Sequence, residues 1–347
     1  MSFRMAIRGI GLVGAFGCGT QAAINALQSG GAPNNVMRIK TPHGDLDYPA
    51  YSADTSSLNT FVSLQKLRRI NKYSRMATLG ACLARQDAGV AVMCQNENMA
   101  VIIASGYGAS STTFAFLDDV ILSGDSFASP TLFANSVHSS AASNISILLE
   151  NNGPCLTITQ FEMSTIAALI NARVVLENRS VNSVLVGGID EINPVVLYCY
   201  YRFWGQRTTN EILPLDFDCQ TAIPGEGAAF VLLTRDEGSP PRYGYIDELL
   251  WVDDSKHNNV SFDGLVIPNA DGHKACGRRY REALGDKDQT KVKTLSHLYG
   301  SMPCGQMFDV ALAALASQRG YIPSDYCSFK LDLDGNLGIV RCSNRSK

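Results

Sequence analysis

The sequence lacks any apolar run of about 18 residues, the length that a helix needs to cross a membrane. Its first residues lack the basic and then apolar organisation of a secretory signal peptide. A strong charge of either sign is also missing, because the 347 residues carry a formal net charge of only -3. Nothing in that charge favours a nucleic-acid partner. We therefore expect a soluble, cytoplasmic protein with no membrane or nucleic-acid partner.

Signatures of metal and dinucleotide sites are missing as well. The ten cysteines form no C-x-x-C pair and no cluster with histidines at zinc spacing, so we expect reduced, buried thiols. The run Gly9–Gly14 matches G-x-G-x-x-G, but the acidic residue required about 20 positions later is absent around Asn34 and Asn35. We interpret the run as a structural turn, and we expect no metal and no cofactor in this chain.

Alternating helical and strand patterns are present along the chain. Apolar residues make up 46% of it, enough for a substantial core in one large domain or two halves. A continuous apolar run predicts a buried strand over Ala100–Ala104. Helical spacing predicts helices over Thr20–Leu27, Met76–Gln86, Thr112–Leu122 and Asp309–Gln318. This alternation indicates an α/β protein built in layers.

The clearest local pattern is a strand, a sharp turn and a helix. Leu156–Thr159 alternates as a strand does, and Ser164–Glu177 carries apolar residues at helical spacing. A second buried strand, Val184–Val186, ends at Gly187 and Gly188. Glu162 lies at the turn, where the N-terminal end of a helix favours negative charge.

Several segments in this order resemble the β-ketoacyl synthases of the thiolase fold. The stretch GPCLTITQFEMSTIAALINARVVLENRSVNSVLVGGIDE (153–191) is similar to that family's Gly-Pro, strand, Thr-Ala-Cys-Ser, helix and Ala-Gly-Gly pattern. Ala6–Leu27 resembles its opening strand, glycine-rich turn and first helix, and Leu213–Leu232 resembles its Pro-Phe-Asp and Gly-Glu-Gly-Ala-Ala segment. The resemblance implies two similar halves in a five-layer αβαβα sandwich.

The division that we expect is an N-terminal half with extended insertions, residues 1–234, and a C-terminal half, residues 235–347. The C-terminal half is expected to be shortened, because the stretch from Gly227 to Asp271 is brief for a full synthase. Arg235–Gly244, with two adjacent prolines, is the candidate connection between the halves. The sequence shows no convincing internal repeat.

The catalytic residues of that family are replaced at all three positions. Glu162 stands where the resemblance expects the nucleophilic cysteine. Asp271, in Asn-Ala-Asp-Gly-His, stands for the first histidine, and Ser301, in Tyr-Gly-Ser-Met-Pro-Cys-Gly, stands for the second. The closing Gly-Phe-Gly-Gly loop is changed to Ser328–Asp332, SFKLD. These losses together imply a subunit without the family's chemistry and with no catalytic residue of its own.

Such a subunit is similar to the chain-length factor, or KSβ, of type II polyketide synthases. The resemblance implies a heterodimer, or a dimer of heterodimers, with an active ketosynthase that condenses carrier-bound malonyl units by decarboxylation. It also implies an acyl carrier protein, which brings the phosphopantetheine, and a tunnel at the subunit interface that limits chain length. Many such subunits carry glutamine at the position of Glu162, so glutamate departs from the pattern. The product class, aromatic polyketide or polyene, stays open.

Two further groups of residues are candidates for these partners. Thr113, Phe114, Phe116 and Phe133 are candidates for the tunnel or interface, with ordinary core packing as the competing interpretation. Lys66, Arg68 and Arg69 are candidates for contact with an acidic carrier protein, with a solvated helix face as the alternative.

Two other functions stay open at this point. The chain could be a stand-alone malonyl-carrier decarboxylase or atypical acyltransferase that uses Glu162, Asp271 or His273 as acid or base. It could also be a homodimeric scaffold. Glu162 itself either caps backbone N–H groups, worth about 0.3–1 kcal/mol, or repels malonyl carboxylates from the vacated acyl site.

Overall fold

A computed structural model describes residues 3–32, 34–94, 97–204, 207–236, 239–253 and 260–344. A ten-stranded mixed sheet runs through the molecule in the order β10-β11-β12-β9-β1-β8-β7-β5-β6, with β2 paired to β1. Its strands are β1 (Met5–Gly14), β2 (Gly17–Cys18), β5 (Met99–Ala104), β6 (Cys155–Ile158), β7 (Ser183–Asp190), β8 (Gly227–Arg235), β9 (Tyr245–Val252), β10 (Leu265–Pro268), β11 (Asp325–Leu331) and β12 (Leu337–Ser343). A separate hairpin joins β3 (Asn35–Thr41) to β4 (Gly44–Ala50).

Helices cover both faces of this sheet and fill the space between its two parts. They are α1 (Gly19–Ser29), α2 (Leu64–Leu67), α3 (Lys72–Asp87), α4 (Ser110–Ser123), α5 (Pro130–Ser136), α6 (Ser140–Leu149), α7 (Ser164–Glu177), α8 (Pro194–Phe203), α9 (Lys274–Leu284) and α10 (Gly305–Gln318). Within the ranges that the structure describes, no helix has the length and apolar character needed to cross a membrane.

The strand order repeats itself between the two parts of the sheet. In the first part β5 is parallel to β6 and β7, β7 is antiparallel to β8, and β8 is antiparallel to β1. In the second part β10 is parallel to β11, β11 is antiparallel to β12, and β12 is antiparallel to β9. A parallel bridge from Val266 to Val292 occupies the place that β6 has in the first part. The duplication that the sequence hides is therefore visible in the topology.

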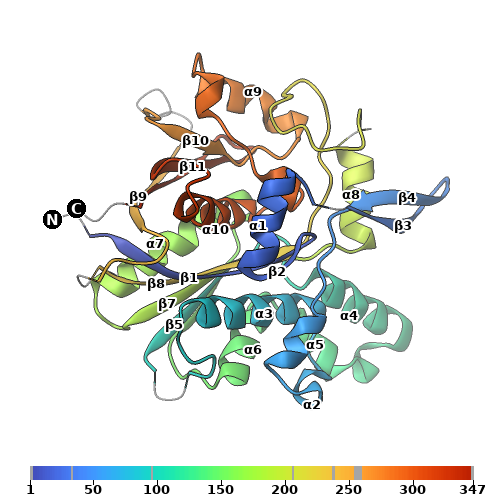
Figure 1. Cartoon of the computed structure of the whole chain (residues 1–347). Coiled ribbons are helices and arrows are strands. Elements are labelled where there is room, and N and C mark those ends of the chain that lie inside the picture. Colours follow the sequence, from blue (N-terminus) through green and yellow to red (C-terminus); the bar gives the residue numbers. More distant parts are fainter. Residues whose placement is uncertain are drawn as a thin grey trace.

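The layers follow from this repeat. Figure 1 shows α9 above β10 and β11, then α7, α10 and α1, then β1, β8, β7 and β5, and finally α3 and α6. Helix α10 is buried on every side from Gly305 to Ser317, and its many alanines let it fit between two sheet layers. Strand β1 joins the two parts, because Met5 and Ala6 pair with Ile246 and Tyr245 of β9. The expected α/β layering is confirmed.

The strongly periodic segments were predicted closely. Helix α7 has the predicted bounds, and the predicted helices over Thr20–Leu27 and Thr112–Leu122 lie within α1 and α4. The hairpin β3–β4 and helix α8 were not predicted. The division into residues 1–234 and 235–347 stays a prediction, and residue 235 is the last of β8.

The interpretation of the run Gly9–Gly14 as a turn is wrong, because these residues lie inside β1. Their glycines have a packing role. A Cβ built on Gly9 would lie 2.2 Å from the carbonyl oxygen of Ala84, and one on Gly11 would lie 1.9 Å from that of Gly80. Both carbonyls belong to α3, so the glycines let this helix rest directly on the strand.

Replacing Gly11 with alanine should therefore separate β1 from α3. We expect the free energy of unfolding to fall by about 1–3 kcal/mol. Urea unfolding measures the change, and Gly31→Ala is the matched control because a Cβ there meets no atom within 4 Å. Equal unfolding midpoints for the two variants would contradict the packing role.

Candidate functional site

The turn that carries Glu162 has a strained backbone. After β6, residues Phe161–Met163 form a short 3-10 turn that leads into α7. Phe161 has a φ of 44°, a conformation that costs a residue with a side chain about 1–3 kcal/mol. The N–H of Gln160 donates to Ser164 Oγ (2.8 Å), and this hydroxyl donates to the carbonyl of Ser105 (3.1 Å). These bonds hold the turn that presents Glu162.

The three residues that the resemblance assigns to catalytic positions meet at one place. Glu162, Asp271 and Ser301 all line a small pocket of about 30 Å³, which has room for about one water molecule. Ser301 Oγ donates a hydrogen bond to Asp271 Oδ2 (2.7 Å). The Ser301 N–H also donates to the carbonyl of Ile223 (2.7 Å), so this loop is fixed against the strand-like segment before β8.

A buried lysine from the altered closing loop lies among these groups. Lys330, at the end of β11, is only 2% exposed. Its Nζ donates to Asn269 Oδ1 (2.7 Å) and to the carbonyl of Met302 (3.3 Å). Its charge favours the ionised forms of Glu162 and Asp271. The change in this segment is visible in the sequence, but the burial of Lys330 is not.

Burial and charge set the protonation of the cluster. Burial raises the pKa of Glu162 above its ordinary value, against the opposing effect of Lys330. Burial also acts to raise the pKa of Asp271, but His273, Lys330 and the Ser301 hydrogen bond outweigh it and leave that pKa lowered. Because burial lowers the pKa of His273, its ring is neutral at pH 7, and Lys330 and Ser301 are the groups that then keep Asp271 ionised.

A fully buried carboxylate lies behind this cluster. Asp309 of α10 accepts hydrogen bonds from Asn269 Nδ2 (2.6 Å) and from the hydroxyl of Tyr299 (2.7 Å). Burial nevertheless raises its pKa to about 7, although both hydrogen bonds and Lys330 oppose the change. Lys330 is thus shared by Glu162, Asp271 and Asp309.

The thiols near the small pocket are not in a reactive form. Cys276 lines the pocket, and burial raises its pKa to about 12. Burial also raises the pKa of Cys304 well above its ordinary value. Both stay protonated at neutral pH, and a protonated thiol is a poor nucleophile.

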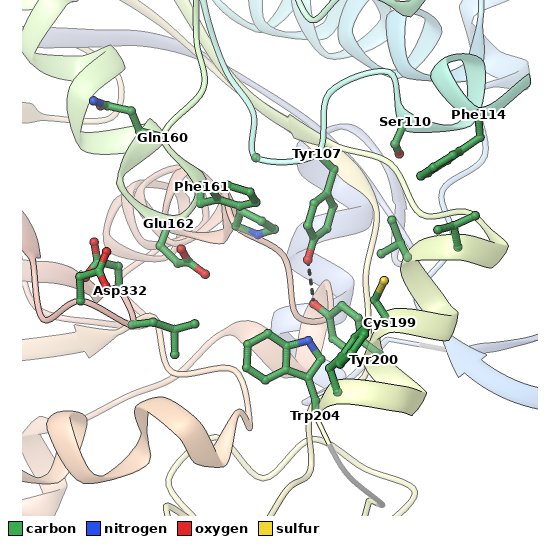
Figure 2. Close-up of a pocket in the computed structure, with 17 residues that line it drawn as sticks. Tyr107, Ser110, Phe114, Gln160, Phe161, Glu162, Cys199, Tyr200, Trp204 and Asp332 are labelled. Carbon is green, nitrogen blue, oxygen red and sulfur yellow. Dashed lines mark hydrogen bonds between the residues drawn. The ribbon is translucent and has the colours of Figure 1, made fainter. Parts of the chain in front are cut away.

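A chain of hydroxyl groups leads outward from Asp271. The hydroxyl of Tyr200 lies 3.1 Å from Ser301 Oγ, and the hydroxyl of Tyr107 lies 3.2 Å from that of Tyr200. Since Ser301 gives its proton to Asp271, Tyr200 donates to Ser301 and Tyr107 donates to Tyr200. Figure 2 shows this tyrosine pair as the dashed contact beside the cavity.

The hydroxyl chain ends at a large cavity of about 900 Å³. Glu162 and Phe161 line it from the turn before α7, while Tyr200 and Trp204 line it from α8 and the residue that follows. Figure 2 shows the Glu162 carboxylate pointing toward the side where Tyr200 and Trp204 lie. Asn193 caps α8, because its Oδ1 accepts from the N–H groups of Val195 and Val196. Apolar walls with a few polar groups are typical of a ligand site.

One of the four tunnel candidates lines this cavity. Phe114 lies in its wall. The hydroxyl of Thr113 donates to the carbonyls of Ala109 and Ser136 and so links α4 to α5. The rings of Phe116 and Phe133 lie 5.4 Å apart between their centroids and join the same two helices. Their role at a tunnel or interface stays a prediction.

The basic segment divides into two groups of side chains. Lys66, Arg68 and Arg69 are exposed at α2 and just after it. Lys72 pairs with the buried carboxylate of Glu226, and Arg75 donates to the carbonyls of Leu67 and Ile70. Lys72 is also exposed, but its charge is paired with Glu226, whereas no salt bridge is found for the three candidate residues among the described residues.

A second set of buried carboxylates supports the wall of the cavity. Glu191 Oε1 accepts from the N–H of Ser111 at the start of α4 (2.8 Å), whereas Oε2 has no hydrogen-bond partner. Burial raises the pKa of Glu191 to about 7, the neighbouring Glu226 adds to the increase, and Lys72 opposes it. Both glutamates are fully buried.

Sequence reasoning missed the aromatic side of the site. Tyr107, Tyr200 and Trp204 belong to no recognised motif, and only the density of aromatic residues in Tyr198–Trp204 could have drawn attention to α8. Among the residues that the structure describes, no group of three or more His, Cys, Asp or Glu side chains could hold a metal ion.

Parts of the sequence are similar to known β-ketoacyl synthases. Residues 45–207 match the model of the β-ketoacyl synthase N-terminal domain. A putative polyketide β-ketoacyl synthase 1 of Streptomyces cyaneus is 24% identical over 260 residues, which cover 71% of this chain and 61% of that relative. The chain thus spans less than two thirds of the curated relative's length.

Solved structures share the fold along the whole chain. The ishigamide ketosynthase/chain length factor is similar with a TM-score of 0.80 at 16% identity, covering 100% of both chains. A β-ketoacyl synthase of Burkholderia phymatum gives 0.79 at 17% identity, covering 99% of this chain and 100% of that one. A type II ketosynthase in complex with its acyl-carrier protein gives 0.73 at 12% identity, covering 99% and 100%. The expected thiolase-like fold is therefore confirmed.

Glu191 should make stability depend on pH. Its folded pKa of about 7 lies above the ordinary value of 4.5, so between these values the folded chain keeps a proton that the unfolded chain releases. The free energy of unfolding should therefore fall as pH rises through this window. Urea unfolding from about pH 5 to about pH 8 measures the slope.

Glu191→Gln should make this slope shallower, because an amide does not titrate. Asp309 adds a slope of the same sign, since its pKa is also raised to about 7, so part of the dependence remains in the variant. Identical slopes for the wild type and Glu191→Gln would show that the folded protein ionises Glu191 at its ordinary pKa.

Proposed function

We propose that this chain, which is β-ketoacyl synthase-like, is the non-catalytic chain-length factor of an active ketosynthase in polyketide synthesis. The observation that carries the proposal is the meeting of Glu162, Asp271 and Ser301 at one small pocket. The three residues that the resemblance assigns to catalytic positions lie together, and none of their side chains is a thiol or an imidazole. Ser301 and Asp271 are bonded to each other, so neither is directed at a substrate.

The chemistry of condensation explains why these replacements matter. A thiolate must hold the acyl chain, and donors must stabilise the negative charge that develops when a malonyl unit loses CO₂. Glu162 is a weak nucleophile, and as a carboxylate it repels the malonyl carboxylate. Lys330 is committed to Asn269 and Met302. Condensation would take place on the partner, and this chain would shape the tunnel.

An exposed apolar face supports the heterodimer. Ile121 (77% exposed), Leu122 (84%) and Phe127 (81%) lie at the end of α4 and just after it, and Ile147 lies on α6. Strand β6, which packs against α6, forms one end of the strand order, and its Leu156 is exposed. Exposed apolar side chains and an open strand edge are both features of protein interfaces. A ketosynthase partner would cover this face, and Phe114, Phe116, Phe133 and Thr113 would border the tunnel.

Co-expression with a ketosynthase that has an intact Cys-His-His site tests the proposal. We expect a 1:1 complex by size-exclusion chromatography, polyketide product from the complex, and no malonyl-carrier decarboxylation by the isolated chain above background. Leu122→Asp should weaken the complex by at least about tenfold, because a charge would be buried in an apolar interface.

The matched control is Leu213→Asp, another exposed leucine, which lies between α8 and β8 and lines neither pocket. A stable homodimer that excludes the ketosynthase would favour a scaffold. Decarboxylation by the isolated chain that is lost in Glu162→Ala would favour an enzyme.

The carrier protein would approach the exposed basic residues Lys66, Arg68 and Arg69. Reversing all three charges to glutamate should weaken binding of an acidic carrier to the complex, and the wild-type affinity should fall as salt is raised. Surface plasmon resonance measures both effects. Reversal of Arg278, Arg281 and Lys291 in and near α9 is the control. Equal carrier affinity in both triple variants would place the carrier site elsewhere.

A further inference from the structure

The large cavity beside Glu162 is acidic on its polar side. Its charged lining consists of Glu162, Asp332 and Asp334, and no lysine, arginine or histidine is among the described residues that line it. Asp332 is already partnered, because Oδ1 accepts from the N–H of Asn336 and Oδ2 from its side chain (2.7 Å each). Asp334 is exposed to solvent, so Glu162 is the half-buried carboxylate that a ligand in the cavity would meet. The field in this cavity attracts cations and repels acids.

The residues behind the cavity do not balance this charge. Lys330 is shared by two carboxylates on the cavity side, Glu162 and Asp271, while Asp309, with its pKa raised to about 7, is only partly ionised. His273 adds no positive charge at neutral pH, because burial lowers its pKa. Uncompensated charge in a desolvated site is costly, so a cation that enters the cavity would be bound with favourable energy.

The remaining walls suit an organic cation better than a metal ion. Aromatic rings of Tyr107, Phe161, Tyr200 and Trp204 surround the Glu162 side of the cavity, as Figure 2 shows. Their faces attract cations within about 6 Å of the ring centroid. A volume of about 900 Å³ far exceeds the needs of a bare ion, and its apolar walls provide no further ligands for one.

The chain of hydroxyl groups indicates which kind of cationic group the ligand carries. Because the donors run from Tyr107 to Tyr200 to Ser301 to Asp271, the Tyr107 oxygen keeps its lone pairs for a donor in the cavity. A primary ammonium has three N–H donors and can meet both Tyr107 and Glu162. A quaternary ammonium could use only the rings and the charge.

We propose that this cavity binds a primary amine, in its ammonium form, on an apolar body. The ammonium lies at Glu162 and Tyr107, and the body lies against Phe161, Trp204 and the apolar residues of α8. This goes beyond the proposed role with a ketosynthase, and it holds or fails whichever partner the chain has.

Binding of three matched probes to the full chain tests the proposal. They are 4-phenylbutylamine, the neutral 4-phenylbutan-1-ol and the anionic 4-phenylbutyrate, compared at constant ionic strength near neutral pH. Trp204 provides a local fluorescence signal in a Trp251→Phe background, since the chain has two tryptophans. We expect the amine to bind at least about tenfold more tightly than the alcohol, and the butyrate to bind least.

Glu162→Gln keeps the shape of the side chain and removes its charge. In this variant the amine should lose its preference over the alcohol, while unchanged binding of the alcohol shows that the cavity is intact. Tyr107→Phe should reduce the affinity for the amine but not for its N-trimethylated form. Glu282→Gln, at an exposed carboxylate paired with Arg278 on α9, should keep the full preference.

Equal affinities of the wild type for the amine and the alcohol would overturn the proposal. Tighter binding of the butyrate, or a tenfold amine preference that survives in Glu162→Gln, would overturn it as well.

Discussion

The buried ammonium of Lys330 is the interaction on which the centre of this protein depends. It binds Asn269 after β10 and the carbonyl of Met302 before α10, and it shares its charge with Glu162, Asp271 and Asp309. These groups come from both parts of the duplicated sheet. The charge of Lys330 therefore acts on residues of both parts at the site. Glu162 and Asp271 share this single cation, and the charged side chains among the described residues that line the large cavity are all carboxylates.

Local sequence patterns were sufficient for the elements that carry their own signal. The bounds of α7 could be predicted because its apolar residues recur at helical spacing and the helix is buried on the side that they define. Helix α8 begins with a proline and is rich in tyrosine, and the hairpin β3–β4 is largely exposed, so neither has a clear periodic pattern. The continuity of the ten-stranded sheet depends on the contact of Met5 and Ala6 with β9, far away in the chain.

The site also combines features that local sequence patterns predict with features that depend on distant contacts. The spacing of residues within the motifs assigned Glu162, Asp271 and Ser301 to the catalytic positions of the β-ketoacyl synthases that the chain resembles. All three residues line one pocket. The sequence could not show that Lys330 is buried, because its partners Asn269 and Met302 are 61 and 28 positions away. Nor could it show that the glycines of β1 serve α3, since a motif records residue types and not the helix that rests on them.

The strained turn at Phe161 has a consequence for how geometry and reactivity are related. Its left-handed backbone aims the next residue at the cavity, and the bonds of Gln160 and Ser164 hold it there although that residue is a glutamate. Shape at this point is therefore maintained by the surrounding scaffold and does not depend on the side chain that it displays. The backbone turn thus fixes the direction of the side chain at position 162, while the chemical type of that side chain can be changed. The residue at this one position then decides whether the site reacts, binds a ligand or only fills space.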